Sequence, residues 1–180
     1  MAIREAIAHH LPKRIVPMLS DLVCSIRDIS DTLLRRKGSL TAPCRLRMVV
    51  GGFKDARFYE EVGRSIIREC IDLGGLSPDS DVLDVGCGCG KQAVPLAGYL
   101  SDKAKYVGFD IVPALINWCT SNISSRYPNF HFQLADVYNK QYNPKGKYRA
   151  SEYRFPYDND SFDFVILGSV FTHMLPPDME

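Results

Sequence analysis

Hydrophobic residues recur at helical spacing along the first part of the chain. The spacing predicts one helix over residues 14–36, ended by Gly38, and a second over residues 55–73, ended by Gly74-Gly75. The apolar positions of the first helix are Ile15, Val16, Leu19, Leu22, Val23, Ile26, Ile29, Leu33 and Leu34. This stripe has to pack on another surface, either the domain that follows or another chain. The linker between the two helices is marked by Pro43, Gly51 and Gly52.

After residue 80 the pattern changes to short apolar runs that end in turns. The runs predict four buried strands, over residues 82–85, 106–110, 130–134 and 162–167. Helical segments are expected between them, over residues 91–100 and 113–127. This alternation predicts an α/β fold in which a parallel sheet carries helices on both faces.

The charge of the chain is divided unevenly, although its total is only +1. Residues 1–50 contain nine Lys and Arg against four Asp and Glu, a net charge of +5, whereas residues 51–180 have a net charge of −4. We therefore predict a basic helical extension over residues 1–50 and a mildly acidic domain over residues 51–180. We interpret the extension as a solvated helix, and leave open an anionic membrane surface, nucleic acid or an acidic partner.

Composition narrows the class of protein further. Hydrophobic residues make up 46% of the chain and charged residues 24%, as in an ordinary globular domain. No apolar run approaches the roughly 20 residues needed to cross a bilayer, and the N-terminus lacks the features of a secretory signal, so we expect a cytoplasmic protein. The six cysteines form no CxxC pair. We expect no metal site and interpret them as small, buried apolar residues, with a redox or metal role for Cys87 and Cys89 as the minor alternative.

The segment with the clearest chemistry is Asp84-Val85-Gly86-Cys87-Gly88-Cys89-Gly90. Alternating glycines after a strand allow a sharp turn and let a ligand approach backbone N–H groups. A dinucleotide-binding GxGxxG turn would need glycine at position 91, where this chain has Lys91. The Asp84 carboxylate suits a ligand with ammonium and sulfonium groups better than a pyrophosphate. Lys91 and Asp84 therefore disfavour a nicotinamide-dependent oxidoreductase.

Asp110 ends the second predicted strand, 26 residues after Asp84. A carboxylate at this point can accept hydrogen bonds from both hydroxyls of a ribose. The alternative is a helix N-cap, because a predicted helix follows at once. We favour the ribose role because of the glycine turn upstream.

Four ordered segments resemble motifs of the class I S-adenosylmethionine-dependent methyltransferases. VLDVGCGCG at 82–90 resembles the first motif, YVGFDI at 106–111 the second and FQLADV at 132–137 the third. FPYDNDSFDFVILGSVFTHM at 155–174 is similar to the region around the fourth strand. The resemblance covers about residues 53–176. It implies a Rossmann-like sheet, S-adenosylmethionine as cofactor and methyl transfer as the activity.

The resemblance also implies which residues bind the cofactor. Asp84 and the backbone of Gly86, Cys87, Gly88 and Gly90 would hold its methionine end.

The remaining implied contacts follow the later strands. Asp110 would hold the ribose, and Ile111 would pack on the adenine face. Asp136 would accept from the adenine amino group, while the Val137 N–H donates to a ring nitrogen. Ser169, beside Gly168, would line the methyl-transfer cleft.

Methyl transfer from a sulfonium requires positioning more than a protein nucleophile. His173 is the candidate general base, because it follows the fourth strand and titrates near neutrality; a packing histidine is the favoured alternative. The polar stretch from Asn139 to Arg154 mixes tyrosines with Lys and Arg. We interpret it as a solvated loop or lid over the acceptor site, with binding of RNA or another anion as the alternative.

Class I methyltransferases normally have seven strands, of which only four are predicted here. We therefore expect a truncated domain whose fourth strand is an exposed apolar edge. The favoured function is methyl transfer to a small molecule, with nucleic acid as a less favoured acceptor. The alternative is a non-catalytic S-adenosylmethionine-binding or interaction module. Self-association is expected through either the N-terminal helix or strand four.

Overall fold

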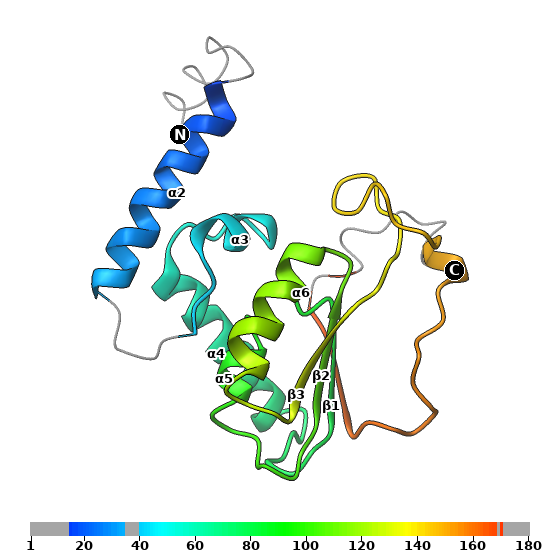
Figure 1. The fold of residues 1–180 in the computed structure, drawn as a ribbon. Helices are drawn as coiled ribbons and strands as arrows, with labels where there is room; N and C mark the ends of the chain where they lie inside the picture. The colour runs from blue at the N-terminus through cyan, green and yellow to red at the C-terminus, as the bar shows by residue number, and fades with distance from the viewer. Residues whose placement is uncertain (1–14, 35–39, 169, 171–180) are drawn as a thin grey trace. The chain divides into compact units, whose positions relative to one another are not determined.

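The computed structural model describes residues 15–34, 40–168 and 170 (Figure 1). The chain divides into two units, residues 1–56 and residues 57–180. The charge pattern placed this division at residue 50, and the structure places it at Ala56.

The first unit contains two helices, α2 over Ile15–Leu34 and α3 over Cys44–Val49. Helix α2 confirms the first predicted helix. Helix α3 corrects the prediction of a linker there: the Pro43 carbonyl accepts hydrogen bonds from the N–H groups of Leu46 and Arg47, at 3.0 and 3.1 Å. Proline suits the start of a helix because its fixed φ is helix-compatible and its missing N–H has no helical role there. The glycines expected in the linker instead end the helix, with Gly51 at φ +128°.

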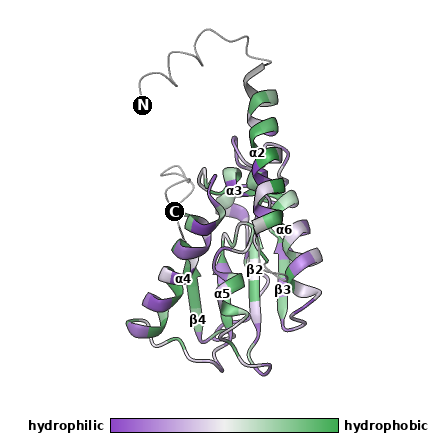
Figure 2. Ribbon diagram, turned by 90° about the vertical axis from the view of Figure 1, so that its left-hand side faces the viewer, coloured by the Kyte–Doolittle hydropathy of each residue, from purple (hydrophilic) through white to green (hydrophobic). Residues whose placement is uncertain are grey.

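The second unit is built on a four-stranded parallel sheet with the order β3-β2-β1-β4. The strands are β1 (Val82–Val85), β2 (Tyr106–Asp110), β3 (Phe130–Leu134) and β4 (Phe164–Leu167). All three pairings are parallel, so the carboxyl ends of the strands meet at one edge. The sequence predicted these strands and their direction, and only β4 begins two residues later than expected. Strand β4, with the sequence Phe-Val-Ile-Leu, is coloured as hydrophobic along its length (Figure 2).

Three helices cover one face of this sheet: α4 (Ala56–Asp72), α5 (Ala93–Leu96) and α6 (Pro113–Cys119). Their apolar side chains and buried strand residues together form the larger core. This core includes Ile67, Leu96, Tyr106, Ile123 and Phe130. Helix α4 matches its prediction. The helix expected over residues 91–100 is reduced to the four residues of α5 between turns. The one expected over residues 113–127 changes at Thr120 into a short π-helical segment, Thr120–Ser124.

A loop covers the other face of the sheet. Side chains of Tyr153, Tyr157 and Phe162 pack there against a second core of Leu83, Val85, Val107, Phe109 and Ala135. In the described part of the second unit, the helices α4, α5 and α6 contribute to the first core. The loop on the other face contains one short helical turn, the 3-10 turn η2 (Ala150–Glu152). Helices on both faces were predicted. The stretch between β3 and β4 is instead rich in Asn, Pro, Gly and Asp, which favour turns over helix.

The described residues include no helix that is both long and apolar enough to cross a membrane.

Candidate functional site

The glycine turn joins the carboxyl end of β1 to the helical face of the sheet. Gly86, Gly88 and Gly90 all have positive φ, at +74°, +57° and +81°. A Cβ atom on Gly90 would lie 2.6 Å from Cδ1 of Ile123, so both backbone conformation and space require glycine there. The N–H groups of Gly86 and Cys87 donate to the Phe109 carbonyl, at 2.9 and 3.0 Å. The turn is therefore fixed to the end of the neighbouring strand β2.

Asp84 lies beneath this turn, with its carboxyl group fully buried. The Tyr106 hydroxyl donates to its Oδ2 at 2.6 Å. Its Oδ1 has no hydrogen-bond partner among the described residues. Burial raises the pKa of Asp84 to about 7, against the opposing hydrogen bond from Tyr106. Ionising a buried carboxyl group is costly when one of its oxygens has no hydrogen-bond partner, and a positive charge above the turn would stabilise the ionised form.

Asp110 connects the turn to the start of α6. Its Oδ2 accepts from the Gly88 N–H at 3.0 Å, and its Oδ1 accepts from the Val112 N–H at 2.9 Å. Burial raises the pKa of Asp110, and these backbone donors oppose the rise. The N-cap of α6 is Val112, without a side-chain cap, so the alternative interpretation of Asp110 as a helix N-cap is wrong. The Ile111 N–H is a third backbone donor to this carboxylate. A carboxylate has about four acceptor sites, so these three donors leave capacity for a ligand hydroxyl.

The residues expected around an adenine lie at the ends of β2 and β3. Ile111 and Val137 are half-buried and pack against the second core. The Asp136 carboxylate receives one long contact, 3.4 Å from the Asn143 side-chain amide. The Val137 N–H donates to the Ala135 carbonyl at 2.7 Å. Because this N–H already has an acceptor, a contact from it to an adenine nitrogen would have to share or replace that bond.

Two predicted site residues, Ser169 and His173, lie outside the described residues. Gly168 marks the end of β4 next to them. A Cβ atom on Gly168 would lie 2.6 Å from the side-chain nitrogen of Gln92, a buried residue that follows the glycine turn. The turn and the end of β4 therefore lie in contact at the carboxyl edge.

Three buried cysteines line the inner side of the turn. The Cys89 thiol is 3.1 Å from the Tyr59 hydroxyl, the Cys119 thiol is 3.6 Å from the Gly88 carbonyl, and Cys87 packs over Gly108. Burial raises the pKa of both Cys87 and Cys119. The described residues contain no group of three or more His, Cys, Asp or Glu side chains placed to hold a metal ion. These thiols fill space beside glycine backbone.

The patterns of the sequence missed Tyr106, Gln92 and Tyr59. The sequence predicted Tyr106 only as a strand residue. Its hydroxyl is the hydrogen-bond donor to the Asp84 carboxyl group among the described residues. Gln92 was included in a predicted helix. A polar residue directly after the glycine turn was the available signal for Gln92, whereas Tyr59 gave none.

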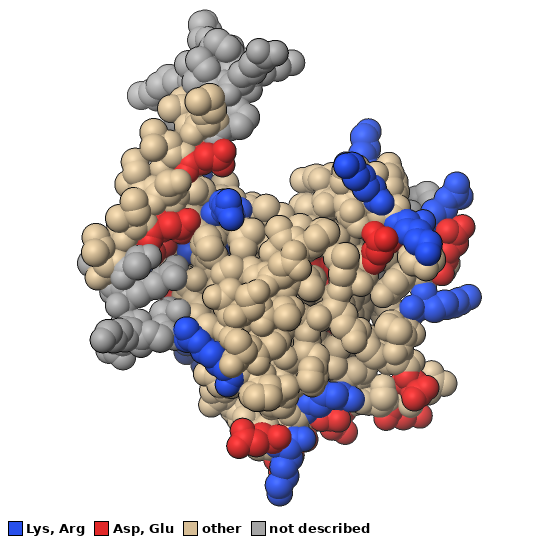
Figure 3. All heavy atoms as spheres, in the orientation of Figure 1, with Lys and Arg blue, Asp and Glu red and all other residues tan. Residues whose placement is uncertain are grey.

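The loop after β3 returns to the same edge of the sheet (Figure 1). The Asp136 carbonyl accepts from the N–H groups of Lys147 and Tyr148, at 2.9 and 3.0 Å. Exposed basic residues in this loop are Lys140, Lys145, Lys147, Arg149 and Arg154. Lys and Arg side chains gather on the corresponding side of the molecule in Figure 3. The loop therefore gives the carboxyl edge a positively charged border.

Comparison with known proteins places these features in a family. A family model described as a methyltransferase domain matches residues 76–179. A solved structure of a protein from Pyrococcus horikoshii OT3 is 19% identical, with a TM-score of 0.50, covering 72% of this chain and 50% of that one. Coclaurine N-methyltransferase bound to N-methylheliamine and SAH is 15% identical, with a TM-score of 0.42, covering 58% and 26%.

A TehB-like SAM-dependent methyltransferase from Corynebacterium glutamicum is 15% identical, with a TM-score of 0.41, covering 69% of this chain and 62% of that one. The likeness to the Pyrococcus protein shows a shared fold. The chain spans half of that protein's length and about a quarter of the length of the coclaurine enzyme.

Proposed function

The chain belongs to this methyltransferase-domain family, and on that premise we propose that it binds S-adenosylmethionine and transfers the methyl group to a small-molecule acceptor. One observation carries the proposal. A glycine turn with three left-handed residues lies between a buried carboxyl group, Asp84, and a partly buried one, Asp110, at the carboxyl edge of a parallel sheet. Ligands of such sheets bind at this edge.

The residues present fit the cofactor. Positive φ at Gly86, Gly88 and Gly90 keeps side chains away from the backbone that a ligand would approach. The free Oδ1 of Asp84 provides an unsatisfied acceptor beneath that backbone, and a cation bound above it would favour the ionised carboxylate. S-adenosylmethionine has an ammonium and a sulfonium group and no phosphate, so the charge beneath the turn attracts it and repels a pyrophosphate.

Each residue would have a different task. The cofactor supplies an activated methyl group when it is bound, so the chain need not provide a nucleophile. Asp84 would act across the turn, because its carboxyl group is sealed from solvent. Asp110 would accept from the ribose hydroxyls with the acceptor capacity that its backbone donors leave open. Ile111 and Asp136 would bind the adenine, and Cys87 and Gly90 would shape the methionine pocket.

The acceptor end of the site is proposed from the sequence. Ser169 would line the methyl-transfer cleft beside Gly168. His173 would remove a proton when the acceptor has to lose one, since its ordinary pKa lies near neutrality. The basic loop over residues 139–154 would cover the acceptor, and its positive charge would favour acceptors that carry a carboxylate or phosphate.

The alternative function is a non-catalytic S-adenosylmethionine-binding module. Its support is that the contacts seen around the glycine turn concern the cofactor end of the site, whereas Ser169 and His173, proposed for the acceptor end, lie outside the described residues. The two functions differ in turnover and agree in cofactor binding.

A transfer assay separates them. The purified chain would be incubated with S-adenosylmethionine labelled in the methyl group and a mixture of small metabolites, total RNA or protein. Label that moves into the small-molecule fraction, and fails to move with Asp110→Ala, supports the proposed enzyme. Label in RNA or protein would identify a different acceptor class. Binding without transfer to any fraction would favour the module.

A further inference from the structure

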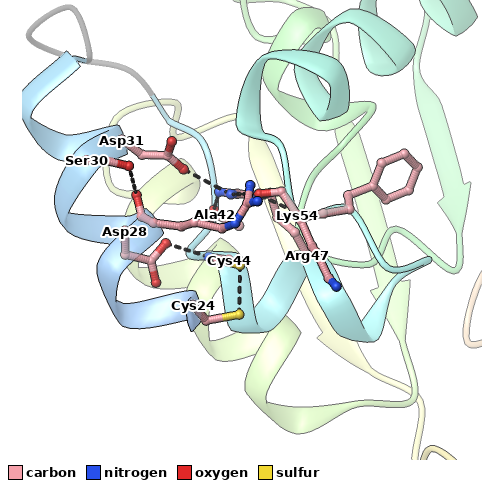
Figure 4. A network of polar contacts seen from close by, with 10 residues as sticks. Cys24, Asp28, Ser30, Asp31, Ala42, Cys44, Arg47 and Lys54 are labelled. Carbon is pink, nitrogen blue, oxygen red and sulfur yellow. Dashed lines mark hydrogen bonds and ion pairs between the residues drawn. The ribbon is translucent and has the colours of Figure 1, made fainter. Parts of the chain in front are cut away.

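Helix α2 faces α3 with polar and thiol groups. The Sγ atoms of Cys24 and Cys44 are 2.7 Å apart, and the Cys44 N–H donates to the Asp28 carboxylate at 2.6 Å. Asp31 pairs with Arg47 at 3.0 Å (Figure 4). Cys24, Asp28 and Asp31 are spaced by four and three residues, so they share one face of the helix. This network fixes which side of α2 is turned toward α3.

The apolar residues of α2 form a separate stripe that is exposed. Their exposed fractions rise along the helix: Leu19 44%, Leu22 56%, Ile26 59%, Ile29 63% and Leu33 80%. At 3.6 residues per turn, the centre of this stripe lies about 180° around the helix from Cys24, Asp28 and Asp31. The hydrophobic face of α2 therefore points away from α3, the helix that it contacts within its own unit.

The spacing of the stripe identifies the kind of partner. Steps of three, four, three and four residues make a strict 3.5-residue repeat, which keeps its apolar seam against another helix that winds around it. A helix packed on a sheet or a broad core usually has a wider 3.6-residue stripe. The spacing therefore favours a helix as the occupant of this seam.

Charge distinguishes the candidate helices and surfaces. The positions that flank the seam within the helix, Met18, Val23, Ser25, Ser30 and Thr32, contain no charged residue. Two identical copies can then meet without repulsion between like charges. An anionic membrane surface is disfavoured, because α2 contains three acidic residues and only Arg27 as a base, whereas membrane-surface helices are rich in Lys and Arg.

We propose that two copies of this chain associate through α2, with Leu19, Leu22, Ile26, Ile29 and Leu33 of each copy forming a two-helix seam. The contact is isologous, because the same stripe lies on both sides. The α3 network holds the seam outward, and the exposed Met18 and Val23 flank it. This inference does not depend on the proposed methyl transfer.

Sedimentation equilibrium of the full chain over a wide concentration range tests it. The wild type is expected to be dimeric at micromolar concentration. Ile26→Lys places a charge in the seam and should raise the dissociation constant at least about 100-fold. Ser20→Lys adds the same charge at an exposed position outside the seam, and should change the constant by no more than about 3-fold. Circular dichroism checks that each variant keeps its helix content.

Three outcomes would overturn the proposal. The first is a wild type that stays monomeric at every concentration. The second is a dimer that Ile26→Lys and the second seam variant, Ile29→Lys, leave unchanged. The third is a monomer whose melting temperature falls with Ile26→Lys but not with Ser20→Lys, which would mean that the stripe packs within its own chain.

Discussion

The Tyr106 hydroxyl donates a hydrogen bond of 2.6 Å to Asp84, and among the described residues it is the one hydrogen-bond partner of this buried carboxyl group. Both side chains belong to neighbouring parallel strands, and both lie on the face that the helices cover. Tyr106 is in turn held by stacking on Phe130, with ring centroids 4.7 Å apart. The carboxyl group under the glycine turn is thus positioned from within the core.

Tyr106→Phe should destabilise the fold by about 1–3 kcal/mol, because it leaves a buried carboxyl group without a donor. The loss should grow as pH rises, since the lost bond favours the ionised form of Asp84. Urea unfolding at pH 5 and pH 8 measures both effects. Tyr99→Phe is the matched control: it removes a bond of 2.9 Å to the neutral Leu76 carbonyl, so its smaller cost should not change with pH.

The raised pKa of Asp84 predicts a dependence of stability on pH. With a pKa of about 7 in the folded chain and 3.8 as its ordinary value, Asp84 holds a proton between these values that the unfolded chain releases. Its contribution to the free energy of unfolding therefore falls as pH rises from about 4 to about 7, and then levels off.

Asp84→Asn stays neutral at every pH and should remove this contribution. Between pH 5 and pH 8 the wild type should lose roughly 2–3 kcal/mol relative to the variant. Denaturant unfolding of both proteins at each pH gives the difference. A constant difference across that range would show that Asp84 is ionised at pH 5 in the folded chain.

Gly90 and Gly75 form a matched pair for the role of the turn. Both have positive φ, +81° and +74°, so alanine strains the backbone at either position by about 1 kcal/mol. A Cβ atom would meet Ile123 at 2.6 Å in Gly90→Ala but nothing within 4 Å in Gly75→Ala. Gly90→Ala should therefore cost a further 1–3 kcal/mol or so. Equal losses in thermal unfolding would mean that the turn tolerates a side chain.

Arg47 is fully buried in the first unit and binds four acceptors: the Asp31 carboxylate and the carbonyls of Ala42, Phe53 and Lys54. Arg47→Lys cannot reproduce this forked geometry and should destabilise the first unit by about 3–5 kcal/mol. Arg64→Lys, at a partly exposed arginine paired on α4, should stay within about 0.5 kcal/mol. Amide hydrogen exchange measures the loss, across residues 40–56 for Arg47→Lys and across α4 for Arg64→Lys.

The parts of the fold that the sequence predicted are those with a strong local signal. Buried parallel strands are continuous apolar runs, and β1, β2 and β3 were predicted within their observed bounds for that reason. The glycine turn was predicted because a backbone with positive φ favours glycine, which can be seen in the sequence. Asp110 was singled out through its position after a strand, and the structure shows its carboxylate accepting from the Gly88 N–H of the turn. Its contact with a ribose stays a prediction.

Features that depend on contacts between distant segments could not be predicted in this way. The bond from Tyr106 to Asp84 depends on the register of two strands. Arg47 lies in a helix as short as six residues, which gives too few positions for a periodic pattern. The loop over the second face of the sheet packs through aromatic side chains with no regular spacing. Helix α3, between Pro43 and Gly51, was predicted as a linker for the same reason.

Isothermal titration calorimetry with S-adenosylhomocysteine tests the central claim most directly. The account predicts saturable binding to the wild-type chain, no comparable binding of NAD, and a loss of affinity of at least about 10-fold in Asp110→Ala. Asp102→Ala, which removes an exposed carboxylate at the opposite end of β2, should bind as the wild type does. Binding of NAD as tight as that of S-adenosylhomocysteine, or unchanged affinity in Asp110→Ala, would contradict it.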